Sequence, residues 1–310
     1  MTPLPIVTIL FQGSTETPEI KGGGYNEFYS FCEERGILLC RASIESFDER
    51  LSVFSQAQFF ESGQWKWRSN IQPDLIYDKT SYFIKKTLQE KRKHIAQQYP
   101  LINPLELSKI LSDKWETYQL FSQYSPESIL LKNSDDFFRI QSLPSKKIII
   151  KPTTGSGGAG IFVCDKKTLP QDLPLPCMVQ EFIEAGSVGN FVSGPHDLRI
   201  LIREQTPFYA FLRIPSSGSF IANLSRGGRI LPIPLEQLPK KIEALVEYST
   251  QTLSSYSPKL YSLDCLFDKQ GIPWILELNS RPGIILEKEE LSFQKTVYNE
   301  FFSLFTEALS

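Results

Sequence analysis

A glycine-rich turn between two apolar segments is the part of the sequence best suited to bind phosphate. Ile148–Ile150 predict a buried strand with Lys151 at its end, and Ile161–Cys164 predict a second strand directly after the turn. The turn contains Gly155, Ser156, Gly157, Gly158 and Gly160. Glycine permits positive φ and close approach of the backbone to a ligand, and successive N–H groups in such a turn form an anion site. The pattern predicts a nucleotide-phosphate site that Lys151 faces; the alternative is a tight hairpin without a ligand.

The turn differs from two common nucleotide-binding motifs. In a P-loop the Lys and the Ser or Thr follow the glycines and open a helix, whereas here Lys151 precedes them and the next segment is rich in β-formers. The spacing of a dinucleotide fingerprint that leads into a helix is not found at this turn either.

Polar residues gather on a hairpin near the C-terminus, whose strands are predicted at Tyr261–Phe267 and Trp274–Leu278. Asp264 lies on one strand, and Glu277 and Asn279 are two residues apart on the other, so the two share a face. Three oxygen donors on one face suit one or two Mg²⁺ ions that also bind substrate phosphates. The alternative is an exposed polar sheet face. The apolar neighbours of Glu277 favour the metal site, because a carboxylate buried among them needs a cation.

The sequence predicts an α/β (α+β) protein whose chain begins with a βαβ unit. Strands at Ile6–Phe11 and Ile37–Cys40 flank a helix over about 26–35. The later predicted elements are a hairpin over 56–68, strands at 74–78, 129–131, 177–184, 198–203, 208–214 and 220–224, and helices at 84–98, 113–124, 135–142, 235–256 and 291–309. We expect three parts: residues 1–101, an N-terminal substrate-side domain; 102–185, with the glycine-rich turn; and 186–310, with the carboxylate hairpin.

Composition narrows the class of protein. The chain has 310 residues and a net charge of −2, which gives no reason to expect nucleic acid or an anionic membrane as a partner. Its 5 cysteines are scattered without CxxC spacing and suit a reduced compartment, and 2 histidines are too few for a histidine-based metal site or triad. We find no signal-peptide pattern and no apolar run near the roughly 20 residues of a membrane span, so we expect a cytoplasmic protein.

The order of these motifs resembles the ATP-grasp superfamily, closest to bacterial glutathione synthetase and its ribosomal-modification (RimK-like) relatives. The resemblance covers about residues 102–287. It is carried by Ile102-Asn103, Asp113-Lys114, Lys151-Pro152 with the glycine-rich turn, Val179–Ile183, His196–Arg199, Leu212–Pro215, Asn223-Leu224, Asp264 and Glu277–Asn279. The implied fold is the ATP-grasp fold behind a pre-ATP-grasp-like N-terminal domain.

The resemblance also implies roles for single residues. Lys114 and Lys151 would hold the α- and β-phosphates of ATP, and the glycine-rich turn would close over them as a lid. The resemblance implies that the adenine would be lined by Gln180, Glu181, Phe182 and Ile183. It also implies a role in nucleotide binding for Asp197. Asp264, Glu277 and Asn279 would bind Mg²⁺, or Mn²⁺ in its place. Arg199 and Arg213 would stabilise the transferring phosphoryl group, with Asn223 beside them as a catalytic residue.

The implied reaction is ATP-dependent ligation of a carboxylate to an amine through an acyl phosphate. The substrates would be a small-molecule carboxylate and an amine such as an amino acid or peptide; whether the chain forms a homo-oligomer is left open. Ser280–Gly283 departs from the glutathione branch, and Arg281 there is a candidate catalytic residue that holds a substrate carboxylate. The N-terminal domain departs too, so we expect it to set specificity near Tyr77–Lys79. The alternatives are an ATP-grasp small-molecule kinase and a non-catalytic nucleotide-binding module.

Overall fold

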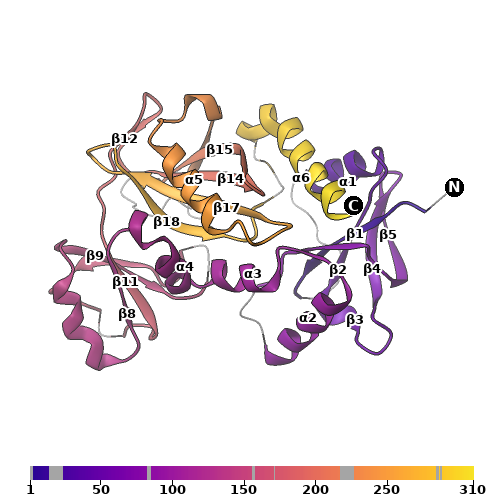
Figure 1. Cartoon of the computed structure of the whole chain (residues 1–310), viewed down its shortest axis with the longest axis horizontal. Helices are drawn as coiled ribbons and strands as arrows, with labels where there is room; N and C mark the ends of the chain where they lie inside the picture. The colour runs from indigo at the N-terminus through magenta and orange to yellow at the C-terminus, as the bar shows by residue number, and fades with distance from the viewer. Residues whose placement is uncertain are drawn as a thin grey trace. The chain divides into compact units, whose positions relative to one another are not determined.

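The computed structural model describes residues 3–13, 24–81, 85–155, 158–170, 172–216, 227–283, 286 and 288–310. They form two compact units (Figure 1). The first unit consists of Met1–Ser108, Ser255–Leu260 and Arg281–Ser310, and the second of Lys109–Ser254 and Tyr261–Ser280. The chain therefore passes from one unit to the other more than once, and the closing helix belongs to the first unit.

The first unit is built on a seven-stranded sheet with the strand order β3-β4-β2-β1-β6-β7, in which β5 pairs with β4. Its strands are β1 (Ile6–Phe11), β2 (Leu38–Ser43), β3 (Phe47–Asp48), β4 (Val53–Glu61), β5 (Gln64–Ile71), β6 (Leu75–Asp78) and β7 (Leu101–Ile102). β1 and β2 are parallel and are joined through α1 (Gly24–Glu33), which confirms the predicted βαβ unit. The hairpin predicted over 56–68 is β4–β5.

Helices cover both faces of this sheet. Leu10 and Ile76 share a core cluster with Ile95 of α2 (Lys86–Gln98). Tyr77, whose side chain alternates with that of Ile76, instead contacts Phe301 of α6 (Gln294–Ala308) at 5.9 Å between ring centroids. α6 also packs on α1. The predicted closing helix is thus confirmed, and it buries the face of β6 opposite to α2.

A buried ion pair ties α2 to the end of β6. The Nε of Arg92 donates to Oδ2 of Asp78 over 2.5 Å, and the side chains are 4% and 0% exposed. The other oxygen of Asp78 accepts hydrogen bonds from the N–H and the hydroxyl of Thr80, at 2.8 and 2.7 Å. The charge of Asp78 is therefore met entirely by neighbours inside the fold.

The second unit contains two antiparallel sheets. One has the order β10-β9-β11-β8 and the other β16-β15-β14-β17-β18. The strands are β8 (Ser128–Leu131), β9 (Lys147–Pro152), β10 (Phe162–Asp165), β11 (Cys177–Glu181), β14 (Asp197–Arg203), β15 (Thr206–Ile214), β16 (Arg229–Ile233), β17 (Leu260–Phe267) and β18 (Pro273–Asn279). A two-stranded ribbon pairs β12 (Ser187–Val188) with β13 (Val192–Ser193).

The remaining helices are α3 (Leu105–Ser112), α4 (Lys114–Phe121) and α5 (Ile242–Thr252), with 3-10 turns at Ile44–Ser46, Ser122–Tyr124, Ser134–Ser142, Leu235–Gln237 and Lys288–Phe293. α5 lies across one face of the five-stranded sheet, where Ser249 bonds to the hydroxyl of Tyr261 over 3.2 Å (Figure 1). Side chains that alternate with Tyr261 on β17 face the other way, and that opposite face carries the polar residues described below. None of the helices in the described part of the chain has both the length and the apolar character needed to cross a membrane.

Some elements differ from the sequence-based expectation. The helix predicted over 235–256 is a 3-10 turn followed by the shorter α5, because Pro239 interrupts the run. β16 was not expected, and the strand predicted at 220–224 lies outside the described residues. The predicted strand 177–184 ends at Glu181.

We expect Arg92→Leu to lower the stability of the first unit, because the variant leaves the buried carboxylate of Asp78 without its cation. Loss of one partner of a buried pair costs roughly 3–5 kcal/mol. Calorimetry or urea unfolding measures the effect, and Lys93→Ala is the matched control, since Lys93 on the same helix is 60% exposed and pairs only with exposed Glu90. Equal stability of the two variants would contradict a structural role for the Arg92–Asp78 pair.

Candidate active site

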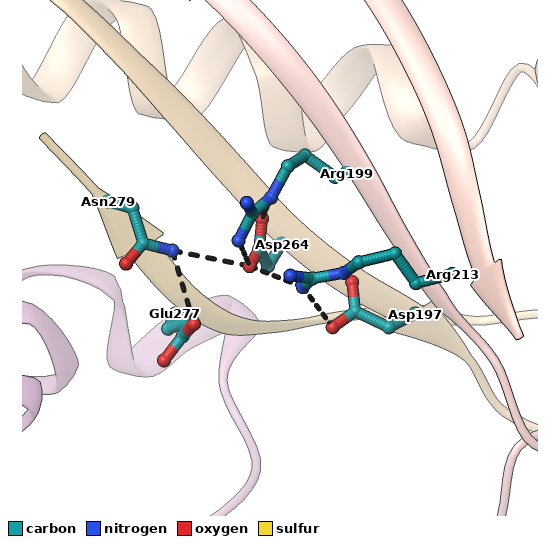
Figure 2. A network of polar contacts seen from close by, with 6 residues as sticks. All are labelled: Asp197, Arg199, Arg213, Asp264, Glu277 and Asn279. Carbon is teal, nitrogen blue, oxygen red and sulfur yellow. Dashed lines mark hydrogen bonds and ion pairs between the residues drawn. The ribbon is translucent and has the colours of Figure 1, made fainter. Parts of the chain in front are cut away.

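The centre of the candidate site is Asp264, whose side chain is fully buried between two guanidinium groups (Figure 2). Arg199 donates from Nε to Oδ1 over 2.7 Å and from Nη2 to Oδ2 over 2.5 Å. Arg213 donates from Nη2 to Oδ2 over 2.6 Å. The two-pronged contact from Arg199 is the geometry in which guanidinium holds a carboxylate most specifically.

Asp197 extends this network by a second acid. It lies directly opposite Arg213 in the β14–β15 pair, and Nη2 of Arg213 also donates to its Oδ2. Arg199 is two residues further along β14 and so faces the same side of the sheet. Two acids and two arginines from three adjacent strands therefore form one ionic cluster.

The two acids of the cluster differ in charge state. Burial works to raise the pKa of Asp264, but the guanidinium groups of Arg199 and Arg213 outweigh it and hold that pKa at about 2. Burial also raises the pKa of Asp197, to about 7. The positive charge of Arg213 lowers this pKa, and the negative charge of Asp264 raises it further. Burial disfavours the charge of Arg213, yet Asp197 and Asp264 raise its pKa above the ordinary value. Asp264 and Arg213 thus stay ionised at neutral pH, whereas Asp197 is close to its titration point.

Glu277 and Asn279 on β18 complete the polar face. Glu277 is the direct cross-strand partner of Asp264, next to a register shift between Asp264 and Cys265. The Nδ2 of Asn279 donates to Oε1 of Glu277 over 3.1 Å and lies 3.3 Å from Oδ2 of Asp264 (Figure 2). Two carboxylates directly opposite one another repel. A group that donates hydrogen bonds or carries positive charge is therefore favoured between them.

These three side chains fit a Mg²⁺ site of the kind that the substrate helps to complete. Among the described residues no group of three or more His, Cys, Asp or Glu is placed to hold a metal. Two carboxylates and one amide would supply part of an oxygen shell, and Mg²⁺ ordinarily keeps waters and takes phosphate oxygens for the remainder. The ion pairs in the described chain use Asp197 and Asp264 but not Glu277. Glu277 is thus the acid of this face best placed to take a metal directly.

Lys151 is held near this face by a chain of side-chain hydrogen bonds. Its ammonium donates to Oε1 of Gln180 over 2.7 Å, and Nε2 of Gln180 donates to the hydroxyl of Ser128 over 3.0 Å. Burial lowers the pKa of Lys151 to about 8, although the charge of Glu277 opposes the change. The Gln180 side chain, predicted to line an adenine, therefore positions Lys151.

Lys114 lies at the start of the glycine-rich turn. Asp113 caps α4 by accepting from the N–H groups of Trp115 and Glu116. The N–H of Lys114 donates to the carbonyl of Thr153 over 2.8 Å, and its ammonium donates to the carbonyl of Gly155 over 2.7 Å. Lys114 thus lies at the beginning of the turn, close enough to Lys151 for the two positive charges to interact.

The described glycines of the turn have the conformations that the sequence predicts. Gly155, Gly158 and Gly160 have φ of 103°, 74° and 70°. A Cβ on Gly160 would also lie 2.8 Å from Pro152 Cγ. Ser156 and Gly157, and the catalytic candidate Asn223, lie outside the described residues.

At the end of β11 and just after it, two N–H groups are used in backbone hydrogen bonds. The N–H groups of Glu181 and Phe182 donate to the carbonyls of Glu127 and Lys147, at 2.8 and 3.1 Å. Among the described residues no backbone hydrogen bond from Ile183 is found. Burial, with a smaller contribution from Glu127, raises the pKa of Glu181.

Comparison with known proteins shows which families the sequence resembles. Residues 114–255 match the family model "Prokaryotic glutathione synthetase, ATP-grasp domain". This part of the chain is therefore similar to the ATP-grasp domain of that family. The match ends before Asp264, Glu277 and Asn279, so the family model does not cover those three residues.

Proteins with similar sequences align with different fractions of this chain. The glutathione synthetase of Vibrio cholerae is 34% identical over 132 residues, which is 39% of this chain and 38% of that protein. The chain therefore spans little more than a third of the length of that relative. The endospore coat-associated protein YheC of Bacillus subtilis is 24% identical over 286 residues, 76% of this chain and 77% of that protein.

Solved structures show the same fold over the whole chain. D-alanyl-alanine synthetase A from Vibrio cholerae has a TM-score of 0.67 at 14% identity and covers 100% of this chain and 98% of that one. The ATP-grasp ligase PsnB, complexed with a minimal precursor, has a TM-score of 0.64 at 13% identity with 99% coverage of both. At these identities the likeness concerns the ATP-grasp fold.

Sequence reasoning missed Ser262. It lies opposite Asn279 in the sheet and two residues from Asp264, so it faces the polar cluster, and its fully buried hydroxyl has no hydrogen-bond partner among the described residues. Oδ1 of Asp197 and Nε of Arg213 are also buried and have no hydrogen-bond partner among the described residues. Such atoms are costly unless a ligand or water meets them. The period-2 spacing from Asp264 is the signal that could have found Ser262.

We expect Asp264→Asn to destabilise the ATP-grasp unit, since the change leaves Arg199 and Arg213 facing each other without the anion between them. A loss of roughly 3 kcal/mol follows from breaking a buried pair. Differential scanning calorimetry measures the loss, with Glu243→Gln on the exposed face of α5 as the control. A variant as stable as wild type would show that Asp264 does not hold the two arginines together.

Proposed function

We propose that the protein is an ATP-dependent ligase that joins a carboxylate to an amine by way of an acyl phosphate, with Mg²⁺ as cofactor. The observation that carries the proposal is the single polar face formed by four adjacent strands. Arg213 comes from β15, Asp197 and Arg199 from β14, Asp264 from β17, and Glu277 and Asn279 from β18. The charge of Lys151 acts on the same face through Glu277 and Asp197. The relatives named glutathione synthetase support the reaction class.

The residues of this face suit the charge that develops during phosphoryl transfer. Lys114 and Lys151 would hold the non-transferred phosphates, and the glycine-rich turn would close over them with its N–H groups. Arg213 has a buried Nε without a partner among the described residues, and it is the arginine we assign to the transferring group. Arg199 is occupied on two of its nitrogens by Asp264 and would orient that acid.

Metal binding falls to Glu277, Asp264 and Asn279. When bound, Mg²⁺ would neutralise phosphate charge and polarise the phosphorus that is attacked. Mg²⁺ would also relieve the repulsion between the facing carboxylates of Asp264 and Glu277.

The proposed reaction has two steps. An oxygen of the substrate carboxylate attacks the γ-phosphorus of ATP, the bond to the bridging oxygen breaks, and ADP leaves with that electron pair. The nitrogen of the amine then attacks the acyl carbon, phosphate leaves, and the amine loses a proton to give the amide. The protein needs no nucleophilic side chain for either step, only positioning and fixed charge. Exclusion of water by the turn would protect the acyl phosphate.

The adenine is assigned to the segment after β11. The N–H of Ile183 would donate to a ring nitrogen of the adenine, while the N–H groups of Glu181 and Phe182 donate to carbonyls inside the protein. Residues 181–183 follow directly on the strand whose Gln180 holds Lys151, so the base and the phosphates would be read by one continuous stretch.

Binding of Mg·ATP is the first expectation from this proposal. ATP with Mg²⁺ should raise the Tm of the protein by mass action. In Glu277→Gln most of the Mg²⁺-dependent increase in Tm should be lost, while the Tm of the ligand-free protein should stay the same. Glu243→Gln serves as the control. No Tm change of the wild-type protein at millimolar Mg·ATP would remove the basis for the proposal.

Hydroxylamine distinguishes the ligase from a kinase that releases a phosphorylated product and from a non-catalytic binder. An acyl phosphate reacts with hydroxylamine to form a hydroxamate, whereas a phosphorylated alcohol does not. We expect ADP release and hydroxamate formation when a panel of amino acids and short peptides is supplied with Mg·ATP and hydroxylamine. ADP release with a phosphorylated alcohol as the product would favour the kinase, and no ADP release across the panel would favour the binder.

A further inference from the structure

The side-chain amide of Asn279 presents its nitrogen to the two facing carboxylates. Nδ2 donates to Oε1 of Glu277 over 3.1 Å and lies 3.3 Å from Oδ2 of Asp264. The oxygen of the same amide points away from Asp264 (Figure 2), and in the described part of the chain it accepts no hydrogen bond. An oxygen on the carboxylate side would face two acceptors, so the nitrogen is the atom that belongs there. The amide is therefore a hydrogen-bond donor to both acids.

This donor orientation does not suit a metal ligand. Mg²⁺ is bound through oxygen, so Asn279 can join Asp264 and Glu277 around the ion only when its oxygen takes the place of its nitrogen. The last torsion of an Asn side chain has two broad minima about half a turn apart, so the exchange needs no movement of the backbone. The nitrogen then faces away from the carboxylates. There it needs an acceptor of its own.

Ser262 offers such an acceptor. It lies directly opposite Asn279 in the β17–β18 pair, and it shares a face with Asp264, two residues along the strand. The Cβ atoms of directly opposed residues are about 4.5–5.5 Å apart, which lets a Ser hydroxyl and an Asn amide form a hydrogen bond. The hydroxyl of Ser262 is fully buried and has no partner among the described residues. Such a group costs folding free energy, and a partner that arrives only together with the metal accounts for its presence.

We propose that Ser262 is a positioning residue for the metal site, because its hydroxyl accepts from Nδ2 of Asn279 once the amide has turned its oxygen toward Mg²⁺. Without the ion, the amide nitrogen relieves the repulsion between Asp264 and Glu277. With the ion, Ser262 stabilises the turned amide. The inference rests on the proposed function, since it needs Mg²⁺ at this face. The four residues belong to the second unit, whereas Arg281, the catalytic candidate that follows them in the chain, belongs to the first.

Ser262→Ala separates this role from a purely structural one. Tm is followed while Mg²⁺ is titrated at one fixed concentration of ADP. Mg²⁺ binding by ADP in solution is the same for every variant, so a difference between variants arises in the protein. We expect the ligand-free Tm of Ser262→Ala to equal or exceed that of wild type, because a buried hydroxyl without a partner is lost. Its apparent affinity for Mg²⁺ should fall about two- to tenfold, the contribution of one hydrogen bond.

Ser249→Ala is the matched control. Ser249 is also fully buried, but its hydroxyl already donates to the carbonyl of Val246 over 2.9 Å and bonds to the hydroxyl of Tyr261 over 3.2 Å. This variant should lower the ligand-free Tm and keep the Mg²⁺ affinity of wild type. If Ser262→Ala lowered the ligand-free Tm as much as Ser249→Ala does, the Ser262 hydroxyl would have a partner without the metal, and the proposal would be wrong.

The Asn279→Asp background tests whether Ser262 acts through the amide. A carboxylate presents oxygen in both directions with or without the metal, so adding Ser262→Ala there should leave the Mg²⁺ affinity unchanged. An equal loss of affinity in both backgrounds would mean that the hydroxyl meets the ligand directly, which overturns the proposal. Equal Mg²⁺ affinity in wild type and Ser262→Ala would overturn it too, while the proposed function stands. If the Tm of wild type does not respond to Mg²⁺ with ADP at all, the metal site fails and the proposed function fails with it.

Discussion

The burial of one carboxylate, Asp264, between two guanidinium groups is the interaction on which the polar face depends. A fully buried charge is tolerated only when opposite charges and hydrogen bonds surround it. Arg199 and Arg213 provide three contacts of this kind, from three nitrogen atoms on two strands. Because the arginines come from β14 and β15 and the acid from β17, the ionic cluster also fixes how these strands face one another. The position of Glu277 then follows from its pairing with Asp264.

Backbone supports at both ends of β17 hold Asp264 in register. At one end the side-chain amide of Asn103 exchanges two hydrogen bonds with Leu260, at 2.7 and 2.8 Å. At the other end Nε2 of His196 accepts from the N–H of Phe267 over 3.1 Å, while its Nδ1 donates to the carbonyl of Gly194. Burial lowers the pKa of His196, which is consistent with a neutral ring in this role. Neither Asn103 nor His196 contacts the polar cluster, yet both help to fix the position of β17 and therefore of Asp264.

The sequence predicted the elements and the shared faces better than the partners within the site. Strand alternation correctly grouped Glu277 with Asn279, and positive φ at Gly155 and Gly160 followed from residue type. It could not show that Gln180 holds Lys151, because the side-chain partner is set by the pairing of β9 with β11 across 29 residues of sequence. Ser262 was missed for a similar reason: a serine in an apolar strand shows nothing unusual until its neighbour across the sheet is known.

The difference between Asp197 and Asp264 shows where the ionic cluster is incomplete. Asp264 has both oxygens engaged and a pKa held low, whereas Asp197 accepts from one side of Arg213 and has its second oxygen buried without a partner among the described residues. Burial therefore dominates at Asp197 and raises its pKa. A cation or a hydrogen-bond donor placed beside that oxygen would favour the charged form of Asp197. Lys151, from the other sheet of this unit, already interacts electrostatically with both Asp197 and Glu277. The charge of Asp264 is thus balanced within the protein, whereas the charges of Asp197, Lys151 and Glu277 are not fully balanced. A ligand that carries phosphate and a divalent cation would balance the charges on that side.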